Sequence, residues 1–365
     1  MVLQATIRWQ PYGASMRYLP AFLCLALVAC GGTTASSSTA TVTSAAIAAT
    51  DPAVTDPTVT DPTVTDPTVT DPTVTDPTVT DPTVTDPAAT DAIVNVWSGP
   101  AADLTALPIG TDLVSTEGAS VGGLFVCDAG NPNGGGAFAV GPWIDEASGT
   151  WDLTGKVYVE GEISWPMAEY SETVDGDTRR IVSNGLPVDA ITGVFPIAAD
   201  DPAYNYDRNP NSIAEAAVDL SLPAEPTVAD TPTCLAKGTI GVFRNGVVAF
   251  ASVDAMNRDA VAYETQDGCD GHPEMSSTYH YHDVPSCLLQ STVGSSTVVG
   301  FANDGFPIVV ERDEVGNLPT NDDLDECHGR TSPILLDGEV VEMYHYSATY
   351  EFPYFMGCYR GTAVA

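Results

Sequence analysis

The sequence contains few basic residues: 12 lysines and arginines stand against 49 aspartates and glutamates, for a formal net charge of −37. Nucleic-acid binding requires basic side chains that neutralise phosphates, so this balance argues against nucleic acid as a partner. It argues equally against docking on anionic lipid through a basic patch. The excess of carboxylates is typical of a highly soluble surface, and no loop has the spacing of an EF-hand calcium site.

Motifs that would define a reaction are missing as well. The sequence has no Gly-x-Ser-x-Gly elbow and no His-Glu-x-x-His helix. No glycine-rich phosphate loop follows a strand pattern, so we expect no nucleotide cofactor. Histidines and carboxylates alone do not define a mechanism, and the sequence therefore leaves open whether the protein is an enzyme.

Long apolar runs are scarce, and the one near the N-terminus, residues 19–29, is too short to cross a membrane as a helix. It follows a single arginine, Arg17, and ends directly before Cys30. These features are typical of an export signal, so we expect residues 1–30 to be a signal peptide and not part of the fold. Met16 would serve as the start of this signal as well as Met1.

The residues around Cys30 resemble a bacterial lipobox, because Leu27-Val28-Ala29-Cys30 is followed by Gly31-Gly32. The resemblance implies a lipid on Cys30 that anchors the protein in a membrane. It also implies a location in the cell envelope, as an outer-membrane lipoprotein that is periplasmic or surface-exposed. A plain secretory signal and a buried helix with a chance cysteine are the alternatives.

The next segment is a tandem repeat. The pentapeptide Asp-Pro-Thr-Val-Thr occurs six times in a row, with degenerate copies on either side, between Asp51 and Thr90. Each proline fixes φ and removes a backbone donor, and the repeat has too little apolar mass to bury. We therefore expect residues 31–91, which begin with a Ser/Thr-rich stretch, to form a disordered tether. With the rise of a polyproline-like chain, the repeat would reach on the order of 100 Å.

An even number of cysteines, six, lies beyond the tether, and no Cys-x-x-Cys pair occurs among them. In an exported protein this number predicts three disulfides, whose connectivity the spacing does not determine. Metal ligation by thiolates is the alternative. The six residues are Cys127, Cys234, Cys269, Cys287, Cys327 and Cys358.

Residues 92–365 contain short segments of alternating or continuous apolar residues separated by turn-forming residues, which is typical of β-strands. Two hairpins are expected, with turns at Asn245-Gly246, a pair suited to a type I′ turn, and at Asn303-Asp304-Gly305. One short helix is expected at residues 211–220. The fold class is therefore mainly β, a disulfide-stapled sandwich or barrel-like head with few short helices. The expected strands are residues 155–165, 241–250, 296–302, 306–310 and 340–350.

Only five histidines occur, all between His272 and His345. Two of them, His280 and His282, sit one residue apart in the run Tyr-His-Tyr-His, and a partial copy, Tyr-His-Tyr, surrounds His345. Residues i and i+2 of an extended strand share a face, so His280 and His282 would project together. Two imidazoles on one face can supply half of a tetrahedral metal site, or an acid–base pair.

Several short motifs follow one another in the second half of the chain. They are Asn209-Pro210-Asn211, residues 241–246, Thr278-Tyr279-His280-Tyr281-His282, Asp304-Gly305-Phe306-Pro307-Ile308, Leu324-Asp325-Glu326-Cys327, Gly329-Arg330, Tyr344-His345-Tyr346, Pro353-Tyr354 and Gly357-Cys358. This ordered set resembles the YHYH-domain family, which is found largely in exported bacterial proteins. The resemblance implies a YHYH-like domain at residues 185–365, preceded by an N-terminal β region of the head at residues 92–184. It implies a type of domain and not a reaction.

The histidines suggest a metal site. If the two Tyr-His-Tyr strands pair, His280, His282 and His345 converge, and His272 or Asp304 could complete four ligands. Imidazole-dominated sites suit zinc or copper. The alternative is a polar ladder on a β face, because tyrosine and histidine are good strand residues.

Other residues near these motifs have simpler interpretations. Asp304 fits a turn at least as well as a metal site. Asp325 and Glu326 fit a capping or surface pair as well as a support for metal ligands. We expect Arg330 to hold a carboxylate in place, and the tyrosines of both Tyr-His-Tyr runs to pack in the core.

Two functions of different classes follow. The first is a lipid-anchored head with a histidine-rich zinc or copper site. The second is a disulfide-stabilised surface module that binds a glycan, polymer or protein and has structural histidines and no metal. A bound metal that disappears when His280 and His282 are replaced would separate them.

Overall fold

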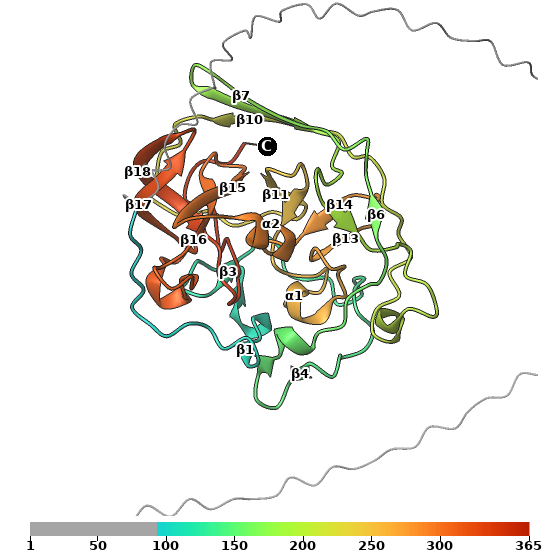
Figure 1. Ribbon diagram of the computed structural model, residues 1–365. Helices are drawn as coiled ribbons and strands as arrows, with labels where there is room; N and C mark the ends of the chain where they lie inside the picture. The colour runs from blue at the N-terminus through green and yellow to red at the C-terminus, as the bar shows by residue number, and fades with distance from the viewer. Residues whose placement is uncertain (1–92, 365) are drawn as a thin grey trace, which may run out of the picture. The chain divides into compact units, whose positions relative to one another are not determined.

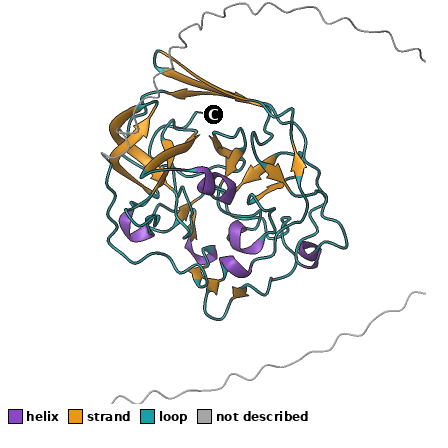
Figure 2. Cartoon of the chain, viewed as in Figure 1, coloured by secondary structure: helices purple, strands orange, loops and turns teal. Residues whose placement is uncertain are grey.

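The computed structural model describes residues 93–364, so the export signal, the lipidated cysteine and the tether expected for residues 1–91 lie outside the described residues. Strands and loops make up most of this part of the chain, and its helices are short (Figures 1 and 2). A helix that crosses a bilayer needs about twenty apolar residues, and no helix between residues 93 and 364 qualifies. The expected mainly β class with few short helices is confirmed.

The largest element is an eight-stranded sheet with the order β13-β14-β12-β11-β15-β16-β18-β17 (Figure 1). Its strands are β11 (Thr239–Phe243), β12 (Val248–Phe250), β13 (Gly271–Pro273), β14 (Tyr279–Tyr281), β15 (Ser296–Ala302), β16 (Pro307–Glu311), β17 (Gly329–Leu336) and β18 (Glu339–Ser347). The strand order is symmetric about the β11–β15 pair. Each half has a hairpin, then a Tyr-His-Tyr strand that runs parallel to the hairpin's second strand, then an antiparallel outer strand.

Smaller elements surround this sheet. Three strands form a separate antiparallel sheet with the order β10-β8-β7, and the other strands pair in twos and threes. These strands are β1 (Leu107–Pro108), β2 (Val114–Ser115), β3 (Leu124–Phe125), β4 (Ile144–Asp145), β5 (Thr150–Trp151), β6 (Ile163–Ser164), β7 (Tyr170–Asp175), β8 (Thr178–Ser183), β9 (Ile191–Thr192) and β10 (Val218–Pro223). The α-helices are α1 (Ala260–Tyr263) and α2 (Ser286–Ser291). The 3₁₀ helices are η2 (Thr111–Leu113), η3 (Leu153–Gly155), η4 (Pro202–Asn205) and η5 (Asn321–Asp323).

Apolar side chains are buried on both faces of the large sheet. On one face, Ile181 and Leu222 of the three-stranded sheet pack in one cluster with Val242 and Phe301. On the other face, a larger cluster includes Phe243, Tyr279, Tyr281, Tyr344 and Tyr346. The strands of the large sheet are covered on both sides, which is why continuous apolar runs such as Val247-Val248-Ala249 form strands here.

Both expected hairpins are confirmed, but the turn at Asn245-Gly246 is not of type I′. Type I′ requires positive φ at both central residues, and only Gly246 has it, at 90°. The Gly246 amide donates to the Phe243 carbonyl at 2.9 Å, so the loop has three residues with glycine last. Gly305 has the same φ of 90° and also donates to the carbonyl three residues before it.

Two expected elements differ in the structure. Residues 211–217 have no regular secondary structure, and β10 (Val218–Pro223) follows in place of a helix. The period-two burial of Val218 and Leu222 against β8 outweighs the weak helical pattern of a short segment. Residues 155–165 contribute only β6 (Ile163–Ser164) and one isolated bridge at Val159, because most of this alternating segment has no strand partner.

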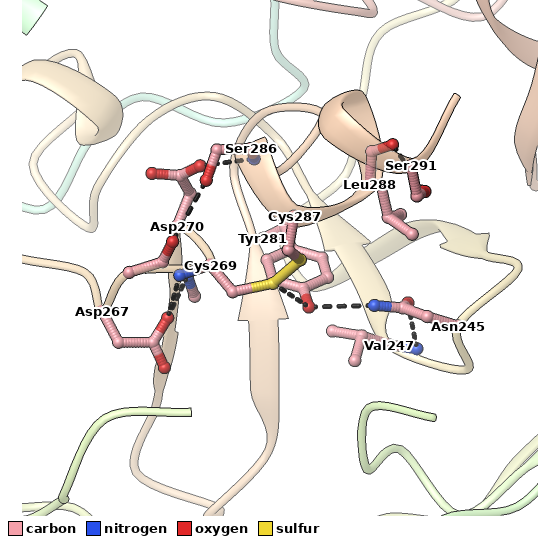
Figure 3. The surroundings of a disulfide bond; sticks show 12 residues. Asn245, Val247, Asp267, Cys269, Asp270, Tyr281, Ser286, Cys287, Leu288 and Ser291 are labelled. Carbon is pink, nitrogen blue, oxygen red and sulfur yellow. Dashed lines mark hydrogen bonds between the residues drawn. A yellow bond between two sulfur atoms is a disulfide. The ribbon is translucent and has the colours of Figure 1, made fainter. Parts of the chain in front are cut away.

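All six cysteines beyond the tether form disulfides, as predicted: Cys127–Cys234, Cys269–Cys287 and Cys327–Cys358. The thiolate alternative is therefore wrong for the described cysteines. Figure 3 shows the Cys269–Cys287 bridge beside Tyr281, whose hydroxyl lies 3.3 Å from Cys269 Sγ and accepts a hydrogen bond from Asn245 Nδ2. This bridge ties α2 to the loop that leads into β13.

Candidate metal centre

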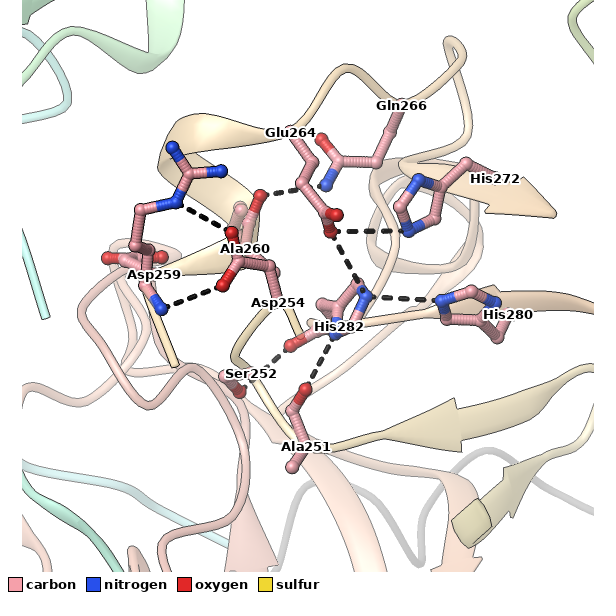
Figure 4. Close-up of polar contacts among 12 residues, drawn as sticks. Ala251, Ser252, Asp254, Asp259, Ala260, Glu264, Gln266, His272, His280 and His282 are labelled. Carbon is pink, nitrogen blue, oxygen red and sulfur yellow. Dashed lines mark hydrogen bonds and ion pairs between the residues drawn. The ribbon is translucent and has the colours of Figure 1, made fainter. Parts of the chain in front are cut away.

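The Tyr-His-Tyr-His run occupies β14 and the residue after it, and alternation separates its side chains as expected. Tyr279 and Tyr281 enter the apolar core, where the Tyr279 hydroxyl donates to Asp267 at 2.9 Å. By the alternation of the strand, His280 and His282 lie on the other face, and Figure 4 shows them beside His272 and Glu264. β13 pairs with β14 in a register that sets His272 directly opposite His280. One ring nitrogen from each of the three histidines lies within 4.8 Å of the others.

Backbone carbonyls determine which ring nitrogen of His280 and of His282 is free. His280 Nδ1 lies 3.1 Å from the Thr278 carbonyl, and His282 Nδ1 lies 2.6 Å from the Ala251 carbonyl. A carbonyl oxygen only accepts, so both Nδ1 atoms carry the proton and both Nε2 atoms keep a lone pair. Histidines that bind a metal through one ring nitrogen usually donate the N–H of the other nitrogen to a carbonyl or carboxylate.

The two free nitrogens face each other, with His280 Nε2 only 3.1 Å from His282 Nε2. Two lone pairs at this distance repel each other unless a cation lies between them. Nitrogens bound at about 2.05 Å to a tetrahedral zinc ion are about 3.3 Å apart. The separation of the two Nε2 atoms therefore fits a shared metal ion.

A buried carboxylate adjoins the three histidines (Figure 4). Glu264, the residue after α1, places Oε2 3.5 Å from Nε2 of both His272 and His282. This oxygen and both ring nitrogens of His272 are buried without a hydrogen-bond partner. Buried polar atoms without partners are rare in folded proteins, and here they surround one point.

Burial keeps the histidines neutral. Desolvation lowers the pKa of His272 and of His280 well below the ordinary value and lowers that of His282 to about 4. Desolvation raises the pKa of Glu264 well above its usual range, and the nearby Asp254 adds to the effect. A neutral imidazole is the form that binds a metal, so the site is ready to accept one at neutral pH.

The histidine cluster lines a cavity of about 1000 Å³. Phe250 forms part of its wall and stacks on His280, with ring centroids 4.1 Å apart. Glu264, Asp207 and Asp254 add carboxylates to the same wall. A ligand in this cavity would reach the histidines directly.

The structure does not bring His345 into this group. The two Tyr-His-Tyr strands do not pair, because β12, β11, β15 and β16 lie between β14 and β18 in the sheet. His345 Nε2 instead lies 3.0 Å from Oε2 of the buried Glu311. Arg330 also contacts Glu311, at 2.8 Å, and so holds a carboxylate as expected.

Asp304 is likewise outside the group and serves the hairpin turn. It accepts hydrogen bonds from the Tyr346 hydroxyl at 2.6 Å and from the Gly361 amide at 2.9 Å. Asp325 accepts from the Cys327 and Gly329 amides at 2.9 and 3.0 Å, which is the capping interpretation. Among the candidate ligands, the structure thus brings together His272, His280 and His282.

Glu264 belongs to the site, but no pattern in the sequence marks it. It precedes His272 by eight residues in the segment Tyr263-Glu264-Thr265-Gln266-Asp267, which has no ligand spacing. Only the fold of the loop between β12 and β13 turns it toward the histidines. Its neighbours in sequence bind elsewhere, since Gln266 donates to the Ala260 carbonyl and Asp267 accepts from Tyr279.

Comparison with known proteins supports the resemblance seen in the sequence. Residues 219–318 match the family described as YHYH protein. The matched residues contain the three clustered histidines and Glu264, whereas His345 lies beyond them. No curated protein and no solved structure matches the chain.

Proposed function

We propose that this chain, through its YHYH region, binds one transition-metal ion, zinc or copper, with His272, His280 and His282 as ligands. The observation that carries the proposal is the pair of free Nε2 atoms of His280 and His282, 3.1 Å apart with both Nδ1 atoms engaged by carbonyls. Imidazole nitrogens suit zinc and copper, whereas magnesium and calcium prefer oxygen ligands. Glu264 places Oε2 3.5 Å from Nε2 of His272 and of His282, and a cation bound there would favour loss of its proton and add an anionic partner.

The proposal includes the cellular setting. We propose that the protein is exported and that a lipid on Cys30 anchors it to the membrane of the cell envelope, with the repeat as a tether. Three disulfides in the head support export, because disulfides persist in oxidising compartments. The low content of basic residues supports the absence of a nucleic-acid partner.

Metal analysis of the purified protein tests the site. Elemental analysis by inductively coupled plasma mass spectrometry should find about one equivalent of zinc or copper per chain. The His280→Ala/His282→Ala variant should contain none. His328→Asn is the matched control, because this buried histidine contacts Thr349 and is not part of the cluster. Asparagine also tolerates the positive φ of 67° at position 328.

The result that would reject the proposal is a wild-type protein without metal whose melting temperature is the same with and without a chelator. That outcome would favour the alternative, a surface interaction module with structural histidines. A signal-peptide test is separate: Cys30→Ala should release the protein from the membrane fraction without changing its metal content.

A further inference from the structure

The half of the large sheet without the histidine cluster repeats the construction of the half that has it. In the first half, Gly271 lies opposite Tyr281 and His272 opposite His280. In the second half, Gly329 lies opposite Tyr346 and Arg330 opposite His345. Arg330 therefore stands at the place of His272, and His345 stands at the place of His280. By the same count, Ser347, which follows Tyr346, stands at the place of His282.

The correspondence extends to the loop before each outer strand. Asp267 accepts hydrogen bonds from the amides two and four residues later and from the Tyr279 hydroxyl. Asp325 accepts from the amides two and four residues later and from the Tyr344 hydroxyl. A β-carbon on Gly271, the first residue of β13, would lie 2.1 Å from Cζ of Tyr279, and one on Gly329, the first residue of β17, would lie 2.5 Å from Cζ of Tyr344.

The hairpins and the loops after them also correspond. The polar turn residues Asn245 and Asp304 each bind the second tyrosine of their half. Eight residues after the turn glycines, Asp254 and Asp313 each accept from the amides two and four residues further on. Because hydrogen bonds agree position by position, the two halves share one design, and their sites can be compared residue by residue.

The cluster in the second half contains a fixed cation. Glu311 accepts from Arg330 Nη2 at 2.8 Å and from Ser347 Oγ at 2.7 Å, and His345 Nε2 lies 3.0 Å from it. The first half also has a buried carboxylate, Glu264, but it comes from another element: Glu264 follows α1, and Ser252 stands at the place of Glu311. The ion pairs of Glu264 within residues 93–364 are with His272 and His282 only. The nearby guanidinium of the first half, Arg258, pairs with Asp254 and forms no ion pair with Glu264.

The two clusters also differ in access. Arg330 lies under the segment that enters the head: it donates to Asn95 Oδ1 at 2.8 Å and lies 4.7 Å from the Trp97 ring centre. The three histidines of the first half line the cavity of about 1000 Å³. The guanidinium of the second half is thus held in place by these contacts, whereas the buried histidines of the first half border a space that a ligand can occupy.

We infer that Arg330, Glu311, His345 and Ser347 form a converted copy of the metal centre, in which the Arg330 guanidinium supplies the positive charge that a bound metal supplies in the first half. This inference rests on the proposed function. The chain then carries one transition-metal site and one latent site of the same chemical class. Restoring imidazoles at the two converted positions creates a second site for zinc or copper.

The first experiment restores the latent site. The Arg330→His/Ser347→His variant keeps Glu311 and His345, and we expect its zinc content to rise from one to two equivalents per chain in zinc-saturated, desalted samples. Arg180→His/Ser291→His is the matched control, since both positions are exposed and lie on separate elements, and it should remain at one equivalent. A folded latent-site variant that stays at one equivalent would overturn the inference.

The second experiment reverses the exchange and does not depend on folding of the first variant. His272→Arg/His282→Ser gives the first half the residues of the second, and it is compared with His272→Ala/His282→Ser, both treated with chelator. We expect the arginine variant to melt several degrees higher, because the guanidinium compensates Glu264. Equal melting temperatures would contradict the inference even if the wild type binds metal. A wild type without metal would reject the proposed function and leave this comparison intact.

Discussion

Each clustered histidine is neutral because its ring is buried, and this has a consequence for stability. The pKa of His282 falls from 6.5 to about 4 through desolvation, and a hydrogen bond to the Ala251 carbonyl only partly opposes the shift. The unfolded chain therefore binds more protons than the folded chain between these two pH values. Where the unfolded state binds more protons, stability falls as the pH is lowered.

A pH series on metal-free protein measures this effect. The contribution of His282 to the free energy of unfolding should be constant above pH 7 and should decrease by about 3 kcal/mol as the pH falls from about 6.5 toward 4. Buried carboxyls such as Asp259 and Asp267, whose pKa values are raised to about 6, contribute with the opposite sign, so the His282 term is read as a difference between two proteins. In urea titrations, the stability of the wild type relative to the His282→Gln variant, which cannot take up a proton there, should fall over this pH range. Parallel curves for the two proteins would show that His282 is not kept neutral by burial.

The carboxylate of Glu311 shows the opposite shift. Burial would raise its pKa, but the contacts of His345 and Arg330 outweigh burial and lower the pKa to about 2. Its side chain is fully buried, so loss of the charge leaves partners without compensation.

Replacing Glu311 by glutamine should therefore lower the free energy of unfolding by about 3–5 kcal/mol. The matched control is Asp219→Asn, which removes the partner of Arg180 in an ion pair whose side chains are each 56% exposed. Water screens exposed ion pairs, so the control should change little. Chemical denaturation of both variants tests the difference, and a similar small loss in both would contradict it.

At the level of elements, the hairpins position the tyrosines that pack behind the histidines. Asn245, in the β11–β12 turn, binds the Tyr281 hydroxyl, and Gly246 gives that turn its positive φ of 90°. An L-residue with a side chain is strained at this φ, whatever space surrounds it.

The Gly246→Ala variant should accordingly lose about 1–3 kcal/mol of stability. Gly118→Ala is the control, because Gly118 has no positive φ and a β-carbon there would meet no atom within 4 Å. Thermal unfolding of the two variants provides the comparison. Equal melting temperatures would mean that the turn accepts a side chain and does not hold Asn245 in place.

Across the whole molecule, disulfides join segments that are distant in sequence. Cys127–Cys234 spans 107 residues and links the N-terminal region of the head to the chain just before β11. Cys269–Cys287 spans only 18 residues. In the chain-entropy account, a bridge over a longer loop restricts the unfolded chain more.

Removal of the long-range bridge should therefore cost more. We expect Cys127→Ala/Cys234→Ala to lose about 4–5 kcal/mol and Cys269→Ala/Cys287→Ala to lose about 3 kcal/mol. Guanidinium titrations of both variants under the same conditions give the ranking. The opposite ranking would indicate that local packing near Tyr281 matters more than loop length.

Local sequence patterns were sufficient to predict the mainly β class, the two hairpins, the disulfides and the shared face of His280 and His282. The strands, the turns and the shared face depend on neighbours in the chain, because strand alternation has a period of two and turns need glycine at particular places. The presence of three disulfides followed from the even number of cysteines, whereas their pairing was decided by the fold. The expected helix at residues 211–220 failed because β8 offered that segment a partner, and a strand partner is not visible in a local pattern.

The membership of the histidine cluster depended on the tertiary structure. His272 and His345 lie 8 and 65 residues from His280 in the chain, and spacing alone did not choose between them. The choice was made by the strand order, which pairs β13 with β14 and sets four strands between β14 and β18. Glu264 joins the histidine cluster through the tertiary structure as well, because the loop between β12 and β13 folds back onto the sheet. Sequence determines which side chains can bind a metal, and the pairing of strands determines which of them meet.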